Sequence, residues 1–300
     1  IRLYREALAI DPEYATAWAG LAGTYAFQTG AHLLPFDEGY GLARDAAERA
    51  LSINEENAEA HAYLGYVSLH ERGDLQAAAR RYERAVELEP TNPDILWLAA
   101  RLARNLGRRD EPVRIMEYVV ARDPVNPANH AGLGSIYWRA GRLDEAISSF
   151  QNALDLSPGH AGSQFAIGVV QLMNGDPEAA LEAIRLEPAE WYRLTGLVMA
   201  YHALGRHADS DEALAELIEK YEEGWAYQIA YALAYRGDVD RAFEWLDRAV
   251  EVNDPGLAEI PTQNLFESLY DDQRWLPFLE SIGRSPEQLA AIEFEAPLPE

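Results

Sequence analysis

The chain contains 300 residues, of which 25 are basic and 50 are acidic, so its formal charge is −25. Such acidity argues against nucleic-acid binding, because a phosphate backbone requires clustered cations. No cysteine is present, which excludes disulfides, cysteine-ligated zinc, iron–sulfur clusters and thiol catalysis. No apolar run reaches the length of about 18 residues that predicts a transmembrane helix, so we expect no membrane insertion.

A fixed period runs through the sequence. Two series of residues recur at intervals of 34: Gly73, Gly107, Gly141 and Gly175, and Pro90, Pro124 and Pro158. A constant interval of this length indicates an array of similar units that stack on one another. A glycine that ends one helix and a proline that follows the next helix explain both series.

The chain begins within a unit. Residues 1–12 carry an apolar stripe of Tyr4, Ala7 and Leu8, which predicts the second helix of a unit whose first helix is absent. We therefore expect a piece of a longer protein, whose uncovered stripe lies partly open or supports self-association.

In the next unit, Thr29–Gly41 is about nine residues longer than the period requires, and we expect a long loop there.

The fullest pattern spans residues 127–160. It reads His130-x2-Leu133-Gly134-x2-Tyr137, then Ala146-x3-Phe150 and Pro158. This resembles the tetratricopeptide repeat (TPR) signature, W-x2-L-G-x2-Y followed by A-x3-F and P. Gly134 lets two antiparallel helices approach closely, and the larger residues form the stripes that pack together. The resemblance implies an all-α fold: a right-handed α-solenoid of about seven TPR helix pairs with a C-terminal helical cap.

The remaining units follow with local changes. One is predicted at roughly 93–126, and the interval from Pro158 to Pro188 lacks about one helical turn. The period ends at Pro255. We therefore predict a TPR array over residues 1–255 and C-terminal capping helices and a tail over residues 256–300. Helices are predicted at 273–282 and from Ser285, and the stretch 295–300 is expected to be disordered.

A narrower resemblance concerns three short segments. Leu33-Leu34-Pro35, residues 197–205 and residues 254–257 together resemble the C-terminal TPR arrays of bacterial multidomain signalling proteins. In those proteins the array follows a nucleotide cyclase, a winged-helix regulator or a Ser/Thr kinase domain. We expect a cytoplasmic location and leave a periplasmic one open.

Motifs for chemistry are missing from the sequence. It contains no H-E-x-x-H, G-x-S-x-G or Walker A motif, and no EF-hand spacing. His61 and His130 fall in the tryptophan slot of their repeats, where packing explains them. We expect neither an enzyme nor a cofactor nor a metal site.

A binding surface remains. The resemblance implies that the first helix of each repeat lines a concave groove. Counting its exposed slots gives a peptide-binding set: Tyr63, Tyr66, Trp97, Arg101, Arg104, Trp138, Arg139, Phe165, Met173, Tyr227 and Tyr231. Aromatic residues and arginine dominate interface hot spots. We expect Arg101, Arg104 and Arg139 to converge and to receive an acidic side chain or a chain terminus. The alternative is that these side chains pack against neighbouring repeats and that the arginines neutralise nearby acidic residues.

The most direct interpretation is a non-catalytic protein–protein interaction module. It would bind an extended peptide segment of an unidentified protein in its concave groove, as part of a larger bacterial signalling or regulatory protein. One alternative is a sensory domain that binds a small molecule and regulates an upstream cyclase, kinase or DNA-binding domain. Another is an oligomerisation module.

Overall fold

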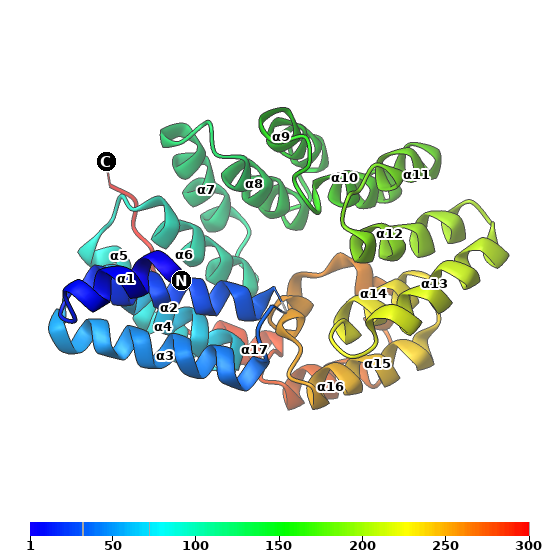
Figure 1. Cartoon of the computed structure of the whole chain (residues 1–300). Coiled ribbons are helices and arrows are strands. Elements are labelled where there is room, and N and C mark those ends of the chain that lie inside the picture. The colour runs from blue at the N-terminus through cyan, green and yellow to red at the C-terminus, as the bar shows by residue number, and fades with distance from the viewer. Residues whose placement is uncertain (32, 72, 300) are drawn as a thin grey trace. The chain divides into compact units, whose positions relative to one another are not determined.

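The computed structural model describes residues 1–31, 33–71 and 73–299, and every regular element in these ranges is a helix. The predicted all-α class is confirmed. The elements, coloured along the chain in Figure 1, are α1 (Arg2–Ile10), α2 (Ala15–Gly30), α3 (Phe36–Ile53), α4 (Ala58–Glu71), α5 (Leu75–Leu88), α6 (Pro93–Asn105), α7 (Asp110–Arg122), α8 (Pro127–Arg139), α9 (Leu143–Leu156), α10 (Ser163–Met173), α11 (Pro177–Arg185), α12 (Glu190–Ala203), α13 (His207–Tyr221), α14 (Ala226–Tyr235), α15 (Val239–Glu251), the 3₁₀ helices η1 (Pro255–Thr262) and η2 (Asn264–Leu269), α16 (Trp275–Ser281) and α17 (Pro286–Ala290).

Helix ends follow from local sequence. Asn92 and Asn126 stand one period apart, and each side chain accepts a hydrogen bond from the first turn of the helix that begins at the next residue, a proline. Proline suits this position because its missing N–H has no intrahelical partner there. At the other end of α8, Gly141 has φ +80°, a left-handed conformation that favours glycine. The periodic glycines are therefore turn residues, as predicted.

Small residues set the approach of paired helices. A Cβ atom on Gly134 of α8 would lie 3.0 Å from the ring of Phe150 in α9. A Cβ atom on Gly168 of α10 would lie 2.5 Å from Ile184 in α11. In both repeats the glycine leaves the space that a large side chain of the second helix fills. The residues that carry the TPR resemblance therefore pack as the signature implies.

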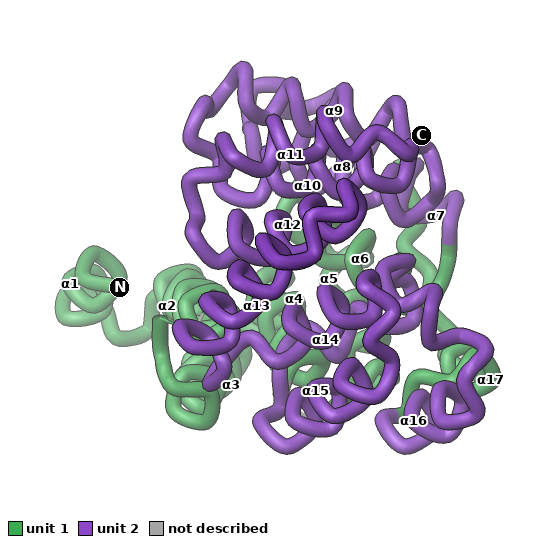
Figure 2. Tube along the Cα trace, turned by 90° about the vertical axis from the view of Figure 1, so that its right-hand side faces the viewer, with its two compact units in different colours: residues 1–108, 283–300 green, residues 109–282 purple. Residues whose placement is uncertain are grey.

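The chain forms two compact units, shown in Figure 2. Unit 1 comprises residues 1–108 and 283–300, and unit 2 comprises residues 109–282. The first therefore contains α1–α6 and α17, and the second contains α7–α16. This grouping follows contacts in space, whereas the predicted division into 1–255 and 256–300 follows the repeat along the sequence. The latter stays a prediction.

Two local expectations have different outcomes in the structure. The missing turn of the fifth repeat is confirmed, because α11 has 9 residues where α9 has 14. The long loop expected at Thr29–Gly41 is wrong. Helix α3 begins at Phe36 and reaches 18 residues, so much of the additional sequence lengthens the second helix. Aspartate and glutamate in its first turn favour this early start.

The C-terminal segment of unit 1 is anchored. Ser285 begins α17 with a capping box, which confirms the helix predicted there. Arg284 is buried and donates a hydrogen bond from Nη1 to the carbonyl oxygen of Gly73 at 3.0 Å. Phe294 is 2% exposed, and its carbonyl oxygen accepts a hydrogen bond from Arg108. Ala296 is buried as well, so the expected disorder is wrong at the start of 295–300, and Glu300 lies outside the described residues.

Candidate interaction surface

First helices of successive repeats lie side by side within each unit. In unit 1, α4 contacts both α2 and α6. In unit 2, α10 contacts α8 and α12, and α12 contacts α14. Each unit thus has a continuous surface made of first helices, which we call its first-helix surface. The residues predicted to bind a peptide belong to these helices.

An aromatic–arginine cluster occupies the first-helix surface of unit 1; its members are Phe27, Tyr63, Tyr66, Trp97 and Arg101. The ring of Phe27 meets those of Tyr63, Tyr66 and Trp97 at centroid distances of 6.0, 5.2 and 6.3 Å. The guanidinium of Arg101 lies 4.8 Å from the centre of the Trp97 ring and 5.6 Å from that of Tyr66. A cation over aromatic faces at these distances is attracted by their quadrupoles.

Exposure within the cluster is graded. Phe27 is 40% exposed, Trp97 and Arg101 are half-buried, and Tyr66 is 5% exposed. Burial raises the pKa of the Tyr63 hydroxyl, so this residue stays uncharged to a more alkaline pH than a free tyrosine does. The cluster therefore offers an apolar base with a cation stacked upon it, which suits a partner carrying both apolar and acidic groups.

Arg104 differs from Arg101 although both lie on α6. It is 5% exposed, and its Nε and Nη2 donate to the Oδ1 atom of the adjacent Asn105 at 3.3 and 3.2 Å. Asn105 itself is fully buried. Arg101 is thus the more accessible of the two arginines that α6 contributes to the predicted set.

Trp138 and Arg139 end α8 in unit 2. The indole Nε1 of Trp138 donates to the sulfur of Met173 at 2.9 Å, which joins α8 to α10. The guanidinium of Arg139 lies 4.2 Å from the centre of the Trp138 ring. The Arg139 side chain is only 6% exposed. The structure therefore brings together three of the predicted residues at this point.

Aromatic residues continue this surface along α10, α12 and α14. Phe165 contacts Tyr192 with a centroid distance of 5.1 Å, and both rings are largely covered. Tyr227 and Tyr231 meet edge to face at 5.4 Å. Burial raises the pKa of the Tyr231 hydroxyl well above its usual range, which keeps this part of the surface uncharged.

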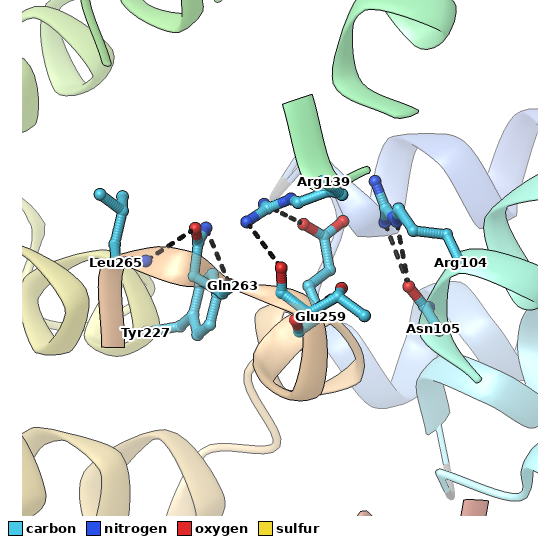
Figure 3. A network of polar contacts seen from close by, with 8 residues as sticks. Arg104, Asn105, Arg139, Tyr227, Glu259, Gln263 and Leu265 are labelled. Carbon is cyan, nitrogen blue, oxygen red and sulfur yellow. Dashed lines mark hydrogen bonds and ion pairs between the residues drawn. The ribbon is translucent and has the colours of Figure 1, made fainter. Parts of the chain in front are cut away.

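The chain itself covers part of this surface. Residues 255–269, which we call the inner segment, comprise η1 and η2, and both 3₁₀ helices pack on α14. The ring of Phe266 lies 5.7 Å from that of Tyr227 and 6.4 Å from that of Tyr231. Figure 3 shows Gln263 reaching the hydroxyl of Tyr227, at 3.3 Å from its Nε2 atom.

The inner segment also supplies the counterion of Arg139. Glu259 Oε2 lies 3.4 Å from Arg139 Nη2 (Figure 3). The carbonyl oxygen of Thr262 lies 3.4 Å from Nη1 of the same guanidinium. These contacts join residues 120 and 123 positions apart in the chain. The predicted occupant was an acidic side chain or a chain terminus of a ligand, and in the structure a carboxylate of this chain contacts Arg139.

Asp254 fixes the start of the inner segment. Its carboxylate accepts hydrogen bonds from the backbone N–H of Gly256 at 2.8 Å and of Tyr227 at 3.0 Å. One residue thereby caps η1 and the first turn of α14 together. Burial raises the pKa of this carboxyl to about 6, against the lowering effect of its two backbone donors.

The count of exposed positions along the first helix of each repeat predicts many, but not all, of the residues that form the first-helix surfaces and their contacts. The convergence of Arg101 and Arg104 with Arg139 stays a prediction, because those residues belong to different units. Phe27 was missed, although the same count extended to the first repeat reaches it. Glu259, Gln263 and Phe266 were also missed, and no repeat signal marks them.

No metal-binding group is found among the described residues: none of their histidine, aspartate or glutamate side chains gather in threes with suitable geometry. The helices of residues 1–31, 33–71 and 73–299 include none that is long and apolar enough to cross a membrane.

Comparison with protein families finds one repeated match. The family model described as tetratricopeptide repeat matches residues 37–93, 68–127, 98–161, 131–191 and 195–258. Together these matches cover well over half of the chain.

Curated relatives are similar over limited regions. Cell division cycle protein 27 homolog A of Arabidopsis thaliana is 32% identical over 106 residues, which are 35% of this chain and 15% of the relative. Anaphase-promoting complex subunit 3 of Dictyostelium discoideum is 32% identical over 111 residues, or 37% of this chain and 11% of the relative. The matches thus span only a small part of those proteins.

Three solved structures share the fold. PilF of Pseudomonas aeruginosa aligns with a TM-score of 0.51 and 16% identity, covering 70% of this chain and 96% of that protein. PilW, described as a type IV pilus biogenesis factor, aligns with a TM-score of 0.55 and 15% identity, covering 67% and 94%. A TPR protein of Thermus thermophilus gives a TM-score of 0.51 and 23% identity, covering 59% and 98%. At such identities the likeness concerns the fold alone, and it agrees with an α-solenoid of TPR helix pairs.

Proposed function

Because the chain belongs to the tetratricopeptide repeat family, whose scaffold is typical of protein–protein interaction modules, we propose that it is a non-catalytic module that binds an extended segment of another protein. The binding surface is formed by first helices and includes the aromatic–arginine cluster of unit 1. In line with the narrower sequence resemblance, we place this module within a larger bacterial signalling or regulatory protein.

The aromatic–arginine cluster carries this proposal. Phe27 is exposed, and Trp97 and Arg101 are half-buried, so all three keep part of their surface accessible to solvent. Aromatic rings and arginine contribute large contact areas with few rotatable bonds, and they are enriched among residues that dominate binding energy. A segment that combines apolar and acidic side chains would cover the rings and meet the guanidinium.

Arg101→Glu tests this proposal. We would select peptides from a random displayed library on the full chain and measure their affinity by fluorescence anisotropy. Reversing the charge at the cluster should weaken the selected peptides by about tenfold or more. Arg80→Glu is the matched control, because Arg80 is an exposed arginine of α5 in the same unit, and it should change affinity less than twofold. Equal effects of the two variants would contradict the proposed site.

Self-association is a second candidate, favoured by one observation. Helix α1 leaves Leu3 69% and Ile10 87% exposed, and the two stand seven positions apart, which places them on one face of the helix. A second copy of the chain could cover them. A sedimentation coefficient that rises with protein concentration would support this function, and a constant value would reject it.

A further inference from the structure

The inner segment lies where the sequence predicts a partner. Arg139, Tyr227 and Tyr231 belong to the predicted peptide-binding set, and each contacts residues between Glu259 and Phe266. We infer that residues 255–269 are an internal ligand of the first-helix surface of unit 2, and that a partner segment binds there by replacing them. This inference rests on the proposed function and adds the chemistry of the partner.

The contacts of the inner segment define that chemistry. Glu259 directs a carboxylate at Arg139, and Phe266 places an aromatic ring against Tyr227 and Tyr231. Gln263, between them, donates from its amide to the Tyr227 hydroxyl. A replacing segment therefore carries an acidic residue followed, within about two turns, by an aromatic residue. It is an acidic–aromatic peptide.

The internal fit at Arg139 is incomplete. Nη2 of the guanidinium lies 3.4 Å from Oε2 of Glu259, whereas a charge-assisted pair of this kind is usually about 2.7–2.9 Å apart. The Nε atom of Arg139 is buried and has no hydrogen-bond partner among the residues that the structure describes. A buried donor without an acceptor is unfavourable. A carboxylate that faced the guanidinium with both oxygens would satisfy Nε and Nη2 together, so a better-placed ligand can replace Glu259.

The backbone of the inner segment favours exchange too. It consists of two 3₁₀ helices of 8 and 6 residues, and the first contains Pro261. Such helices have poorer hydrogen-bond geometry than α-helices and are uncommon beyond about four residues. Contacts with the first-helix surface therefore hold this conformation, and the segment can leave without unwinding an α-helix of the solenoid.

The covalent attachment sets how strongly the segment competes. Residue 255 follows α15 after three residues, so the tethered copy acts at an effective concentration on the order of millimolar. A free peptide reaches the surface only in the fraction of molecules whose inner segment has left, and its apparent affinity falls by that fraction. Weakening the tethered copy must therefore strengthen the binding of a free one.

A peptide of the chain's own sequence provides the probe. A labelled, terminally blocked peptide of residues 254–270 would be titrated into the full chain and into Glu259→Gln, with folding checked by thermal melting. We expect Glu259→Gln to bind the peptide at least about tenfold more tightly than the unaltered chain. Glu267→Gln is the matched control, because this exposed residue of η2 loses the same charge, and it should bind as the unaltered chain does. Adding Arg139→Gln to Glu259→Gln should abolish the gain.

Hydrogen exchange gives a readout that needs no variant. Saturating peptide should increase amide exchange in residues 255–269 of the unaltered chain, because the tethered copy is displaced. Equal peptide affinity in all variants, or unchanged exchange in this segment, would overturn the inference and identify the inner segment as a permanent cap. Arg101-dependent library peptides combined with equal affinity of the 254–270 peptide in all variants would refute this inference and leave the proposed site at Arg101 standing. An absence of Arg101-dependent peptides combined with tighter peptide binding by Glu259→Gln would refute that site and leave this inference standing.

Discussion

Replacing Gly134 by leucine should separate the helices of the fourth repeat. A Cβ atom at this position already lies 3.0 Å from three carbons of the Phe150 ring, where carbon atoms normally rest about 3.5–4.0 Å apart. Alanine alone would require the ring to move by several tenths of an ångström. Leucine adds three further carbons to a buried site, and overpacking of this kind costs about 1–3 kcal/mol.

The helix itself offsets part of that cost. Leucine is a better helix former than glycine, by up to about 1 kcal/mol. We therefore expect a net loss of about 1–2 kcal/mol in the free energy of unfolding, which lowers the melting temperature by about 2–8 °C. Urea unfolding followed by circular dichroism measures the first quantity, and calorimetry measures the second.

A second glycine supplies the control. Gly41 lies inside α3 with no heavy atom within 4 Å of a Cβ, so Gly41→Ala gains helix propensity without a clash. It should stabilise the chain by about 0.5–1 kcal/mol. Opposite signs for the two variants would establish that contact with Phe150, and not the loss of glycine, decides the outcome. A Gly134→Leu variant that melts with the parent would refute the assignment of Gly134 to the contact between α8 and α9.

Two further predictions concern the C-terminal third of the chain. The pKa of Asp254 is raised to about 6 from its usual 3.8, so the native state binds a proton more readily than the unfolded state. The stability that this protonation contributes is therefore lost as pH rises from about 4 to about 6. Asp254→Asn should remove this loss, up to about 3 kcal/mol, and flatten the pH dependence of the free energy of unfolding in that window; an unchanged slope would contradict the burial of the carboxyl. Phe294→Ala should lower the free energy of unfolding by up to about 3–5 kcal/mol, because the ring of Phe294 is 2% exposed. The control Glu293→Ala, at the adjacent exposed residue, should lower it by less than about 0.5 kcal/mol. Similar urea midpoints for the two variants would show that the C-terminal segment is not anchored.

Periodicity predicts those parts of the fold that depend on near neighbours. The turn conformation of Gly141, the contact of Gly134 with Phe150 and the shortened α11 all follow from intervals in the sequence. Each repeat packs mainly on the repeats beside it, so the sequence pattern of one repeat contains most of the information about the packing of that repeat. The cap at Ser285 follows equally well from a short local motif.

Expectations that relied on the period for irregular segments were less accurate. A count of additional residues gives the length of an insertion but not its conformation, and the insertion near Thr29 became the early start of α3. The C-terminal end contains no repeat signal, yet Phe294 is buried in unit 1, where the guanidinium of Arg108 lies 5.6 Å from the centre of its ring. The composition near a terminus does not indicate such a contact.

The candidate site shows the same division between local and distant information. The sequence predicts that Arg139, beside Trp138 in an acidic chain, will receive an acidic side chain or a chain terminus of a ligand. It does not predict that a carboxylate of this chain contacts Arg139, because 50 acidic residues are available and the 34-residue period ranks none of them. Glu259 reaches Arg139 because Asp254 caps α14 and η1 together, which turns the chain back across the first-helix surface after the last repeat. The Glu259 carboxylate lies 3.4 Å from Nη2 of Arg139, and Nε of Arg139 is left without an acceptor among the described residues. The same geometry makes this contact the place where a partner's carboxylate gains most over the one that the chain provides.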